Sequence, residues 1–351
     1  MFSLLKKVLL GGAVLLGTMP QASDACTNFI ISTQDNAIIN GRSMEFAVFL
    51  PTAIKVVPKG ETVQSVGPNN QKGMSWTTKY AYAGIAIFEQ GIVIDGLNEQ
   101  GLSVGGLWFR DGQYPDISKA PASTIMAYTD VIRWLLGNFA TTEEAKNALP
   151  KINVFTFPIP GIPGGPAPIH LAIHDAAGSS AVMEFIDGKM RIMDNPVGVL
   201  TNSPEFTWQL TNLRNYINLT AVNKDEEKLG GLVVAPSGEG SGLLGIPGDW
   251  TPPSRFVRAV LYKQFAKKAP NVQEGVNAAL HILNAFDIPY GTIRTAKSEG
   301  DYTQWVVIKD LATKKLYART YTDPTIVSVD LNRETAKGAK TIPLHSVPVH
   351  Y

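Results

Sequence analysis

The chain is poor in cysteine and in charge. It has one cysteine among 351 residues, so no disulfide can form within the chain. Charged residues make up only 17% of it, and 31 basic against 30 acidic residues leave a net charge of +1. This balance excludes the broad basic field expected of a nucleic-acid-binding protein. A hydrophobic content of 44% is instead typical of a globular protein with a large core.

Long apolar runs are also missing, and the longest one near the start predicts export rather than a membrane span. Lys6 and Lys7 precede an apolar run over residues 8–16, and small residues follow as far as Ala25. That run is too short to cross a bilayer, but the order basic, apolar, small is typical of a secretory signal. We therefore expect residues 1–25 to be a cleaved signal peptide and the protein to be periplasmic or secreted.

The single cysteine, Cys26, comes directly after the expected cleavage site. It could carry a lipid, although Asp24 fits that kind of signal poorly. It could be an inert buried residue. It could also be a nucleophile with its own base, because cleavage would leave an α-amine of pKa about 7.7 to 8.0 beside a thiol of pKa about 8.5. A single residue would then supply both groups, without a histidine partner.

Strand-like runs occur in hairpins and helical patterns occur in separate stretches, which predicts an α+β fold with antiparallel sheets covered by helices. We expect one domain over residues 26–351. The expected strands cover residues 27–32, 37–40, 91–97, 102–108, 170–174, 181–185, 189–193, 197–201, 303–308 and 315–321. The expected helices cover residues 123–139, 142–149, 205–219, 254–269 and 272–285.

Short motifs in a fixed order give the chain a family resemblance. They are Cys26-Thr27-Asn28-Phe29, Gly41-Arg42-Ser43-Met44-Glu45-Phe46, Asp95-Gly96-Leu97-Asn98-Glu99-Gln100-Gly101-Leu102, Leu200-Thr201-Asn202-Ser203-Pro204, Gly240-Ser241-Gly242-Leu243, Ser254-Arg255-Phe256 and Asp301-Tyr302-Thr303-Gln304-Trp305. The set resembles the choloylglycine hydrolases, a family of N-terminal nucleophile hydrolases that contains penicillin V acylases and conjugated bile salt hydrolases. The resemblance implies a four-layer αββα sandwich, no metal or organic cofactor, and a homotetramer.

The resemblance also implies catalytic roles. Cys26 stands at the nucleophile, and Arg42 at an arginine whose charge favours the thiolate. Asn202 stands at the asparagine that donates to the oxyanion, and Arg255 at a second arginine that supports the site or binds charged substrate groups. Glu45 occupies the position of an aspartate that holds the α-amine, and it is longer by one methylene.

Glu45 raises a geometric question, because it follows Arg42 by three residues. In a regular strand the two side chains would point to opposite faces. If both serve the site, the strand is expected to end or bulge near Met44.

The expected substrate is a small amide with a hydrophobic acyl group. Trp108 stands where the family uses a backbone N–H as the second oxyanion donor, and with Met44, Phe46 and Phe109 it predicts an apolar pocket. Its indole favours penicillin V or an N-acyl homoserine lactone over conjugated bile salts, which remain the alternative. A further alternative of another class is an exported binding protein or lipoprotein that has lost catalysis.

Other chemistry is weakly indicated. His170 and His174 are spaced like a pair of zinc ligands, but the run HLAIHD reads as a strand and no third ligand is near in sequence. We therefore expect no metal site. The glycines over residues 230–248 lack the Lys-Ser/Thr of a phosphate loop and predict a mobile loop.

Overall fold

The computed structural model describes residues 25–88, 91–162, 165–294 and 300–349. The predicted signal peptide therefore lies outside the described residues, except for Ala25. Within the described part of the chain, no helix has both the length and the apolar character needed to cross a membrane.

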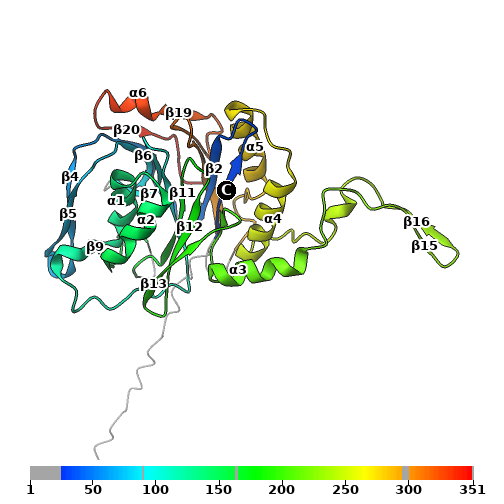
Figure 1. The fold of residues 1–351 in the computed structure, drawn as a ribbon, viewed down its shortest axis with the longest axis horizontal. Coiled ribbons are helices and arrows are strands. Elements are labelled where there is room, and N and C mark those ends of the chain that lie inside the picture. Colours follow the sequence, from blue (N-terminus) through cyan, green and yellow to red (C-terminus); the bar gives the residue numbers. More distant parts are fainter. Residues whose placement is uncertain (1–24, 89–90, 163–164, 295–299, 350–351) are drawn as a thin grey trace, which may run out of the picture.

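Two large sheets form the centre of the molecule (Figure 1). The first has six strands in the order β14 (Val199–Leu200), β1 (Ala25–Ser32), β2 (Ile38–Phe46), β17 (Tyr302–Asp310), β18 (Lys315–Thr320) and β19 (Val327–Asp330). The second has eight, in the order β13 (Lys189–Asp194), β12 (Ser180–Ile186), β11 (Ile169–His174), β8 (Ser103–Trp108), β7 (Ile92–Asn98), β6 (Tyr82–Ile87), β3 (Thr52–Val57) and β20 (Lys340–Pro343). Every pairing in the two sheets is antiparallel, as the sequence predicts.

Helices cover the outer face of each sheet, which makes the four layers of an αββα sandwich (Figure 1). The helices α4 (Pro252–Phe265) and α5 (Val272–Asn284) pack on β1 and β2. On the other side, α1 (Val131–Asn138) packs on β7 and α2 (Thr142–Ala148) on β12. The helix α3 (Phe206–Asn212) lies against α4, and the short α6 (Leu331–Thr335) lies beside β3 and β19. The predicted fold is confirmed.

The two strands that carry the first motifs lie at the centre of the sandwich. All nine residues of β2 are buried, because one face meets the other sheet and the opposite face meets α5. Gly41 permits this packing, since a Cβ there would come within 2.8 Å of the Phe29 ring. The result is a buried hairpin of β1 and β2, paired from Ala25↔Glu45 to Ser32↔Ile38.

The structure differs from the sequence predictions in two helices. The helix expected over residues 205–219 is α-helical only from Phe206 to Asn212 and continues as a 3₁₀ turn to Tyr216. The helix expected over residues 123–139 begins only at Val131. Its first part instead forms β9 (Ile125–Ala127), which pairs in parallel with β10 (Asn153–Phe155) and is flanked by 3₁₀ turns. Tertiary pairing overrides the local helical pattern here. The strands β3, β6 and the hairpin of β4 (Thr62–Val66) and β5 (Lys72–Thr77) were not anticipated either.

The glycine-rich segment is a projecting arm rather than a plain loop (Figure 1). Between α3 and α4 the chain leaves the body and forms a two-stranded hairpin of β15 (Glu227–Leu229) and β16 (Leu232–Val234). The apolar side chains of this arm are exposed, namely Ile217, Val222, Leu229, Leu232, Val233, Val234 and Leu244.

Candidate active site

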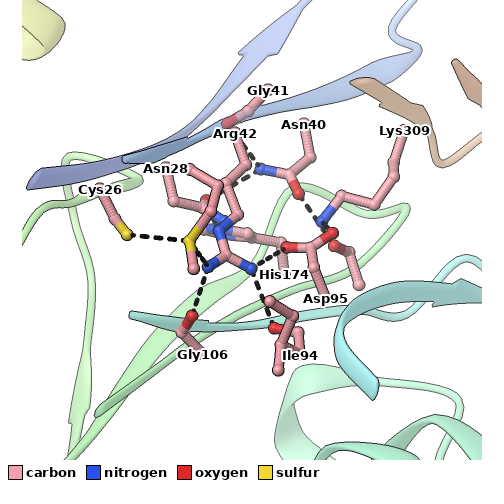
Figure 2. Close-up of polar contacts among 12 residues, drawn as sticks. Cys26, Asn28, Asn40, Gly41, Arg42, Ile94, Asp95, Gly106, His174 and Lys309 are labelled. Atoms are coloured by element: carbon pink, nitrogen blue, oxygen red, sulfur yellow. Dashed lines mark hydrogen bonds and ion pairs between the residues drawn. The ribbon is translucent and has the colours of Figure 1, made fainter. Parts of the chain in front are cut away.

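Cys26 lies near the start of β1, directly opposite Met44 of β2. Its side chain is buried and its Sγ lies 3.5 Å from Sδ of Met44 (Figure 2). Because Ala25 precedes it in the described chain, its nitrogen is a peptide N–H, and this N–H donates to Oδ1 of Asn202 at 2.7 Å. Cleavage after Ala25 would turn that donor into an amine without moving the thiol.

Arg42 holds its guanidinium between the two sheets, beside the sulfur of Met44 (Figure 2). Its Nη1 donates to the Ile94 carbonyl at 2.9 Å and pairs with Oδ2 of Asp95 at 3.2 Å. Its Nη2 donates to the Gly106 carbonyl at 2.6 Å and lies 3.6 Å from Sδ of Met44. Four contacts from two sheets thus fix the cation close to the thiol.

Burial and Arg42 act in opposite directions on the thiol. Burial raises the pKa of Cys26, and the Arg42 charge is the largest effect that opposes it. Arg42 lowers the pKa of the thiol, as expected. In the chain that still carries Ala25, however, burial is the stronger effect, and the pKa is raised.

Glu45 lies on the face of β2 opposite to Arg42. The prediction of a break or bulge near Met44 is wrong for β2, which pairs with β1 without interruption. The irregularity lies in the neighbouring β17, between Thr303 and Trp305, where β17 has one extra residue. A regular strand therefore directs Glu45 away from the intersheet face that carries the thiol.

The Glu45 carboxyl is buried beneath the helices. Its Oε1 accepts a hydrogen bond from the Thr303 hydroxyl at 2.9 Å, and its Oε2 has no hydrogen-bond partner among the described residues. Burial raises the pKa of Glu45 to about 8, and the nearby Arg255 charge opposes that rise. Glu45 pairs in register with Ala25, so an amine created at the next residue would arise beside a carboxyl that has an unused acceptor.

Arg255 and Asn202 hold the backbone around Cys26. Arg255 reaches down from α4, donates to the Cys26 carbonyl, and donates to the Thr27 hydroxyl at 3.0 Å. Its Nη2 also donates to Oδ1 of Asn202 at 2.7 Å. Because two donors converge on Oδ1, the amide nitrogen of Asn202 must point the other way, where it donates to the Trp108 carbonyl at 2.8 Å.

The two expected oxyanion donors lie on the same side of β8. The Phe109 N–H donates to the Pro168 carbonyl at 2.8 Å. Backbone polar groups alternate sides along an antiparallel strand, so the N–H and carbonyl of Trp108 point away from β11. Nδ2 of Asn202 contacts that same carbonyl and keeps a second N–H for another acceptor.

A cavity of about 70 Å³ opens beside the thiol. Met44, Phe46 and Trp108 line it as expected, and the rings of Phe46 and Trp108 are 5.5 Å apart. The loop before β11 also contributes, through Ile159, Ile162 and Ala167.

Phe109 does not line this cavity, which corrects the expectation. It directly follows Trp108, the last residue of β8, and its N–H continues the pairing with Pro168, so its side chain points to the opposite face. There the ring is fully buried and stacks on His170, with centroids 4.8 Å apart and planes 3° apart.

The two histidines of β11 are structural. His170 bonds Glu184 and the Thr201 carbonyl, each at 2.9 Å. His174 bonds Asn28 at 2.9 Å and Ser180 at 2.8 Å. Among the described residues, no group of three or more His, Cys, Asp or Glu side chains could hold a metal ion.

Sequence reasoning missed two groups behind Arg42, namely Asp95 and Lys309. Both are fully buried, and the Lys309 ammonium pairs with Oδ1 of Asp95 (Figure 2). A signal was present, because Lys309 directly follows the apolar run from Val306 to Ile308 in a strand-like segment. A lysine inside such a strand is rarely buried without a partner.

Comparisons with known proteins agree with this geometry. Residues 26–342 match the family described as linear amide C-N hydrolases, choloylglycine hydrolase family. A bile salt hydrolase/transferase from Clostridium perfringens is 34% identical over 89% of this chain and 94% of its own length. A penicillin V acylase from Pectobacterium atrosepticum is 28% identical over 92% of this chain and 84% of its own length.

Solved structures agree as well. A structure of conjugated bile acid hydrolase from Clostridium perfringens superposes with a TM-score of 0.80 and 32% identity, covering 93% of this chain and 99% of that one. Penicillin V acylase from Agrobacterium tumefaciens superposes with a TM-score of 0.74 and 27% identity, covering 92% of each chain. The chain therefore belongs to the choloylglycine hydrolase family, and it is a hydrolase of the carbon–nitrogen bonds of linear amides.

Proposed function

We propose that this protein is exported, is cleaved after Ala25, and hydrolyses amides of hydrophobic acids with Cys26 as the nucleophile. The single observation that carries the proposal is the position of Cys26. Its thiol lines the apolar cavity, and its nitrogen donates a hydrogen bond to Asn202. The family match beginning at residue 26 supports the same boundary.

The first half-reaction forms a thioester. The Cys26 amine takes the thiol proton, and the thiolate attacks the amide carbon, so that a C–S bond forms and the carbonyl π pair moves onto oxygen. Nδ2 of Asn202 and the Trp108 N–H donate to this oxyanion. The intermediate then collapses, the C–N bond breaks, and the Cys26 ammonium gives its proton to the leaving nitrogen.

The second half-reaction releases the acid. Water attacks the thioester carbon as the Cys26 amine takes its proton, and the C–S bond breaks to restore the thiol. Glu45 would hold the amine from the helix side, with its second carboxyl oxygen as the acceptor. Arg255 would position the Cys26 backbone through the carbonyl it already binds.

Conjugated bile salts are the substrate class that the comparisons favour. The bile salt hydrolase/transferase of Clostridium perfringens has 34% identity, against 28% for the penicillin V acylase of Pectobacterium atrosepticum. The structural likeness has the same order, with TM-scores of 0.80 and 0.74. Both comparisons thus favour the substrate that the sequence interpretation gave as the alternative.

Penicillin V and N-acyl homoserine lactones are a second candidate, favoured by the cavity itself. Its volume of about 70 Å³ is well below the roughly 300 to 1,000 Å³ of pockets that enclose drug-sized ligands. The Trp108 and Phe46 rings form an aromatic wall suited to a slim acyl group. A steroid would require these side chains to move.

The deciding experiment combines intact mass with turnover of glycocholate, penicillin V and a long-chain acyl homoserine lactone. We expect a mass that corresponds to residues 26–351 and cleavage of glycocholate. Cys26→Ser should reduce turnover by at least 100-fold, because the hydroxyl is a far weaker nucleophile beside an amine base. A lipid-modified mass, or a Cys26→Ser variant as active as wild type, would contradict the mechanism.

The variant Trp108→Asn separates the two substrate classes. It removes the indole wall but keeps the backbone N–H that donates to the oxyanion. If the cavity must widen for steroids, glycocholate turnover should rise while penicillin V turnover falls. Equal losses for both substrates would contradict a role of the indole in acyl selection.

We further propose that the projecting arm docks on a second copy of the chain, in the homotetramer expected from the resemblance. An isolated two-stranded hairpin is marginally stable in water, and this one exposes Leu229, Leu232 and Val233. Burial of these side chains against another copy would stabilise it. Replacing all three by serine should shift the protein to a smaller species in light scattering, and an unchanged mass would contradict this role.

A further inference from the structure

Lys309 is a buried cation for which the mechanism above has no use. It lies on β17, next to β2, and its side chain is fully buried between the sheets. Burying an ammonium group is costly even when it is paired, and apolar replacements of buried ion pairs are often neutral or stabilising. Stability alone is therefore a weak reason for a lysine at this position.

One carboxylate, that of Asp95, joins Lys309 to Arg42, and Arg42 contacts the same Met44 sulfur as the thiol (Figure 2). Oδ1 of Asp95 pairs with the Lys309 ammonium, and Oδ2 pairs with Nη1 of Arg42 at 3.2 Å. Each cation thus takes one oxygen. Without Lys309, both oxygens would be available to Arg42 as a bidentate pair, the strongest arrangement for a guanidinium and a carboxylate.

The site is built to hold this shared carboxylate. Gly105 lies opposite Asp95 in the β7–β8 pairing, and a Cβ there would come within 2.5 Å of Oδ2. His174, which also faces the cluster from β11, is neutral because burial and the charges of Lys309 and Lys263 hold its pKa well below the usual range. The local charges facing Arg42 are therefore those of Asp95 and Lys309, while Glu45 and Arg255 act on Cys26 from the helix side.

We propose that Lys309 is a positioning residue for the Cys26 thiolate: by ion pairing with Asp95 it leaves part of the Arg42 charge uncompensated, and it keeps the guanidinium against the Met44 sulfur that the thiol also contacts. This inference rests on Cys26 being the nucleophile. The net charge of the three groups is +1 with Lys309 protonated and zero without it. Arg42 then faces the thiol as a cation in the first case and as half of a neutral pair in the second.

The pH behaviour of Lys309 supports this arrangement. Burial lowers the pKa of Lys309 to about 8, although the negative charge of Asp95 acts to raise it. At pH 7 the ammonium is therefore still mostly protonated, and it loses its charge within the range in which a thiol titrates.

The test is the pH dependence of alkylation by iodoacetamide in the processed protein. Cys26 is the only cysteine, so the loss of free thiol reports on it alone. We expect Lys309→Met to raise the midpoint of the rate profile by about one pH unit and to slow alkylation at pH 7 about tenfold. Methionine is unbranched and only one atom shorter than lysine, and the Arg42–Asp95 pair remains, so the variant should fold.

Lys263→Met is the matched control. Lys263 is partly buried and its pKa is also lowered to about 8, but its ammonium donates to the Val197 carbonyl at 2.5 Å rather than to Asp95. Its loss should leave the midpoint and the rate within twofold of wild type. A similar shift in both variants would mean a general effect of removing a buried lysine and would overturn the proposal.

Epistasis with Asp95→Asn tests the route of action. If Lys309 acts by compensating Asp95, Lys309→Met should shift the midpoint by less than about 0.3 pH units once Asp95 is neutral. A full shift in that background would show that Lys309 acts without Asp95, against the proposal. If Asp95→Asn does not fold, the comparison of Lys309→Met with wild type is the test by itself. Identical pH–rate profiles of alkylation for these two proteins would refute the proposal.

The same measurements separate this inference from the proposed function. A wild-type thiol that reacts only as fast as an ordinary cysteine and supports no turnover would contradict the nucleophile itself. A reactive wild-type thiol with an unshifted Lys309→Met variant would contradict only the role of Lys309. The shift between variants can be measured whether or not a substrate is known.

Discussion

At the residue scale, two buried carboxyl groups near Cys26 have opposite surroundings. Asp95 lies between two cations, whereas Glu45 has one hydroxyl donor and an Oε2 without a partner among the described residues. Burial therefore dominates at Glu45 and raises its pKa to about 8. The carboxyl remains largely protonated at neutral pH until an amine is created beside it.

This predicts a stability of the unprocessed chain that falls with rising pH. Glu45 has a folded pKa of about 8, against an unfolded value of 4.5. The folded state therefore binds more protons between these pH values, so its stability is fully present below about pH 4.5 and is lost toward pH 8. With 8 − 4.5 = 3.5 pKa units, the loss is at most about 4 to 5 kcal/mol.

Urea unfolding of the unprocessed chain at pH 5 and pH 8, with Glu45→Gln as the comparison, measures this effect. The variant cannot ionise, so its stability should change less than that of wild type over this interval. Parallel pH dependences for the two proteins would contradict the raised pKa of Glu45.

At the scale of elements, the close approach of α5 to β2 supports the strand that carries Arg42. Asn271 caps the helix by accepting the Glu274 N–H at 3.0 Å. Gly275 in the first turns allows the contact, since a Cβ there would come within 2.6 Å of Thr33 and 3.1 Å of Ile39. At this point the helix backbone therefore lies directly against the side chains of Thr33 and Ile39.

Gly275→Ala tests which effect is stronger at this contact. Alanine gains about 1 kcal/mol of helix propensity over glycine, but overpacking a rigid core costs about 1 to 3 kcal/mol. We expect a net destabilisation of about 1 kcal/mol in urea unfolding. Asn277→Ala, at an exposed position of the same helix, should be neutral or slightly stabilising. A Gly275→Ala variant more stable than wild type would show that the sheet moves away at little cost.

At the scale of the whole molecule, the two sheets are joined by charge as well as by apolar packing. Arg42 and Lys309 belong to the six-stranded sheet, and Asp95 belongs to the eight-stranded sheet. The pair and its shared carboxylate therefore bridge the layers at the point where the thiol lies. Removing the anion would leave two cations buried without a counterion.

Asp95→Asn should accordingly cost about 3 to 5 kcal/mol, measured by urea unfolding at pH 7. The comparison is Lys146→Ala, which breaks a surface ion pair with Asp194 of 2.7 Å and should change the stability by less than about 1 kcal/mol. If Asp95→Asn were as mild as Lys146→Ala, water or a shifted side chain would have to compensate the cations. Because Lys309→Met removes one of those cations, the double variant should recover part of the lost stability.

The sequence by itself determined the family, the antiparallel α+β class and most of the residues around Cys26. These follow from local order: hairpin spacing, apolar periodicity, and motifs that begin at the cysteine. Met44, Phe46 and Trp108 could be assigned to one pocket because the family resemblance covers the segments that contain them, and all three line the cavity. The arm was expected only as a loop, since its two strands have three residues each and lie in a glycine-rich segment.

Only the tertiary structure decided which face each side chain uses and which charges share a partner. The continuous pairing of β2 put Glu45 on the helix side, and the strand alternation at β8 turned Phe109 away from the cavity. The ion pairs of Asp95 with Arg42 and Lys309 join positions 53 and 214 residues apart in the chain. Such contacts form only when the two sheets stack. A local sequence pattern spans a few residues and cannot show which distant residues will meet.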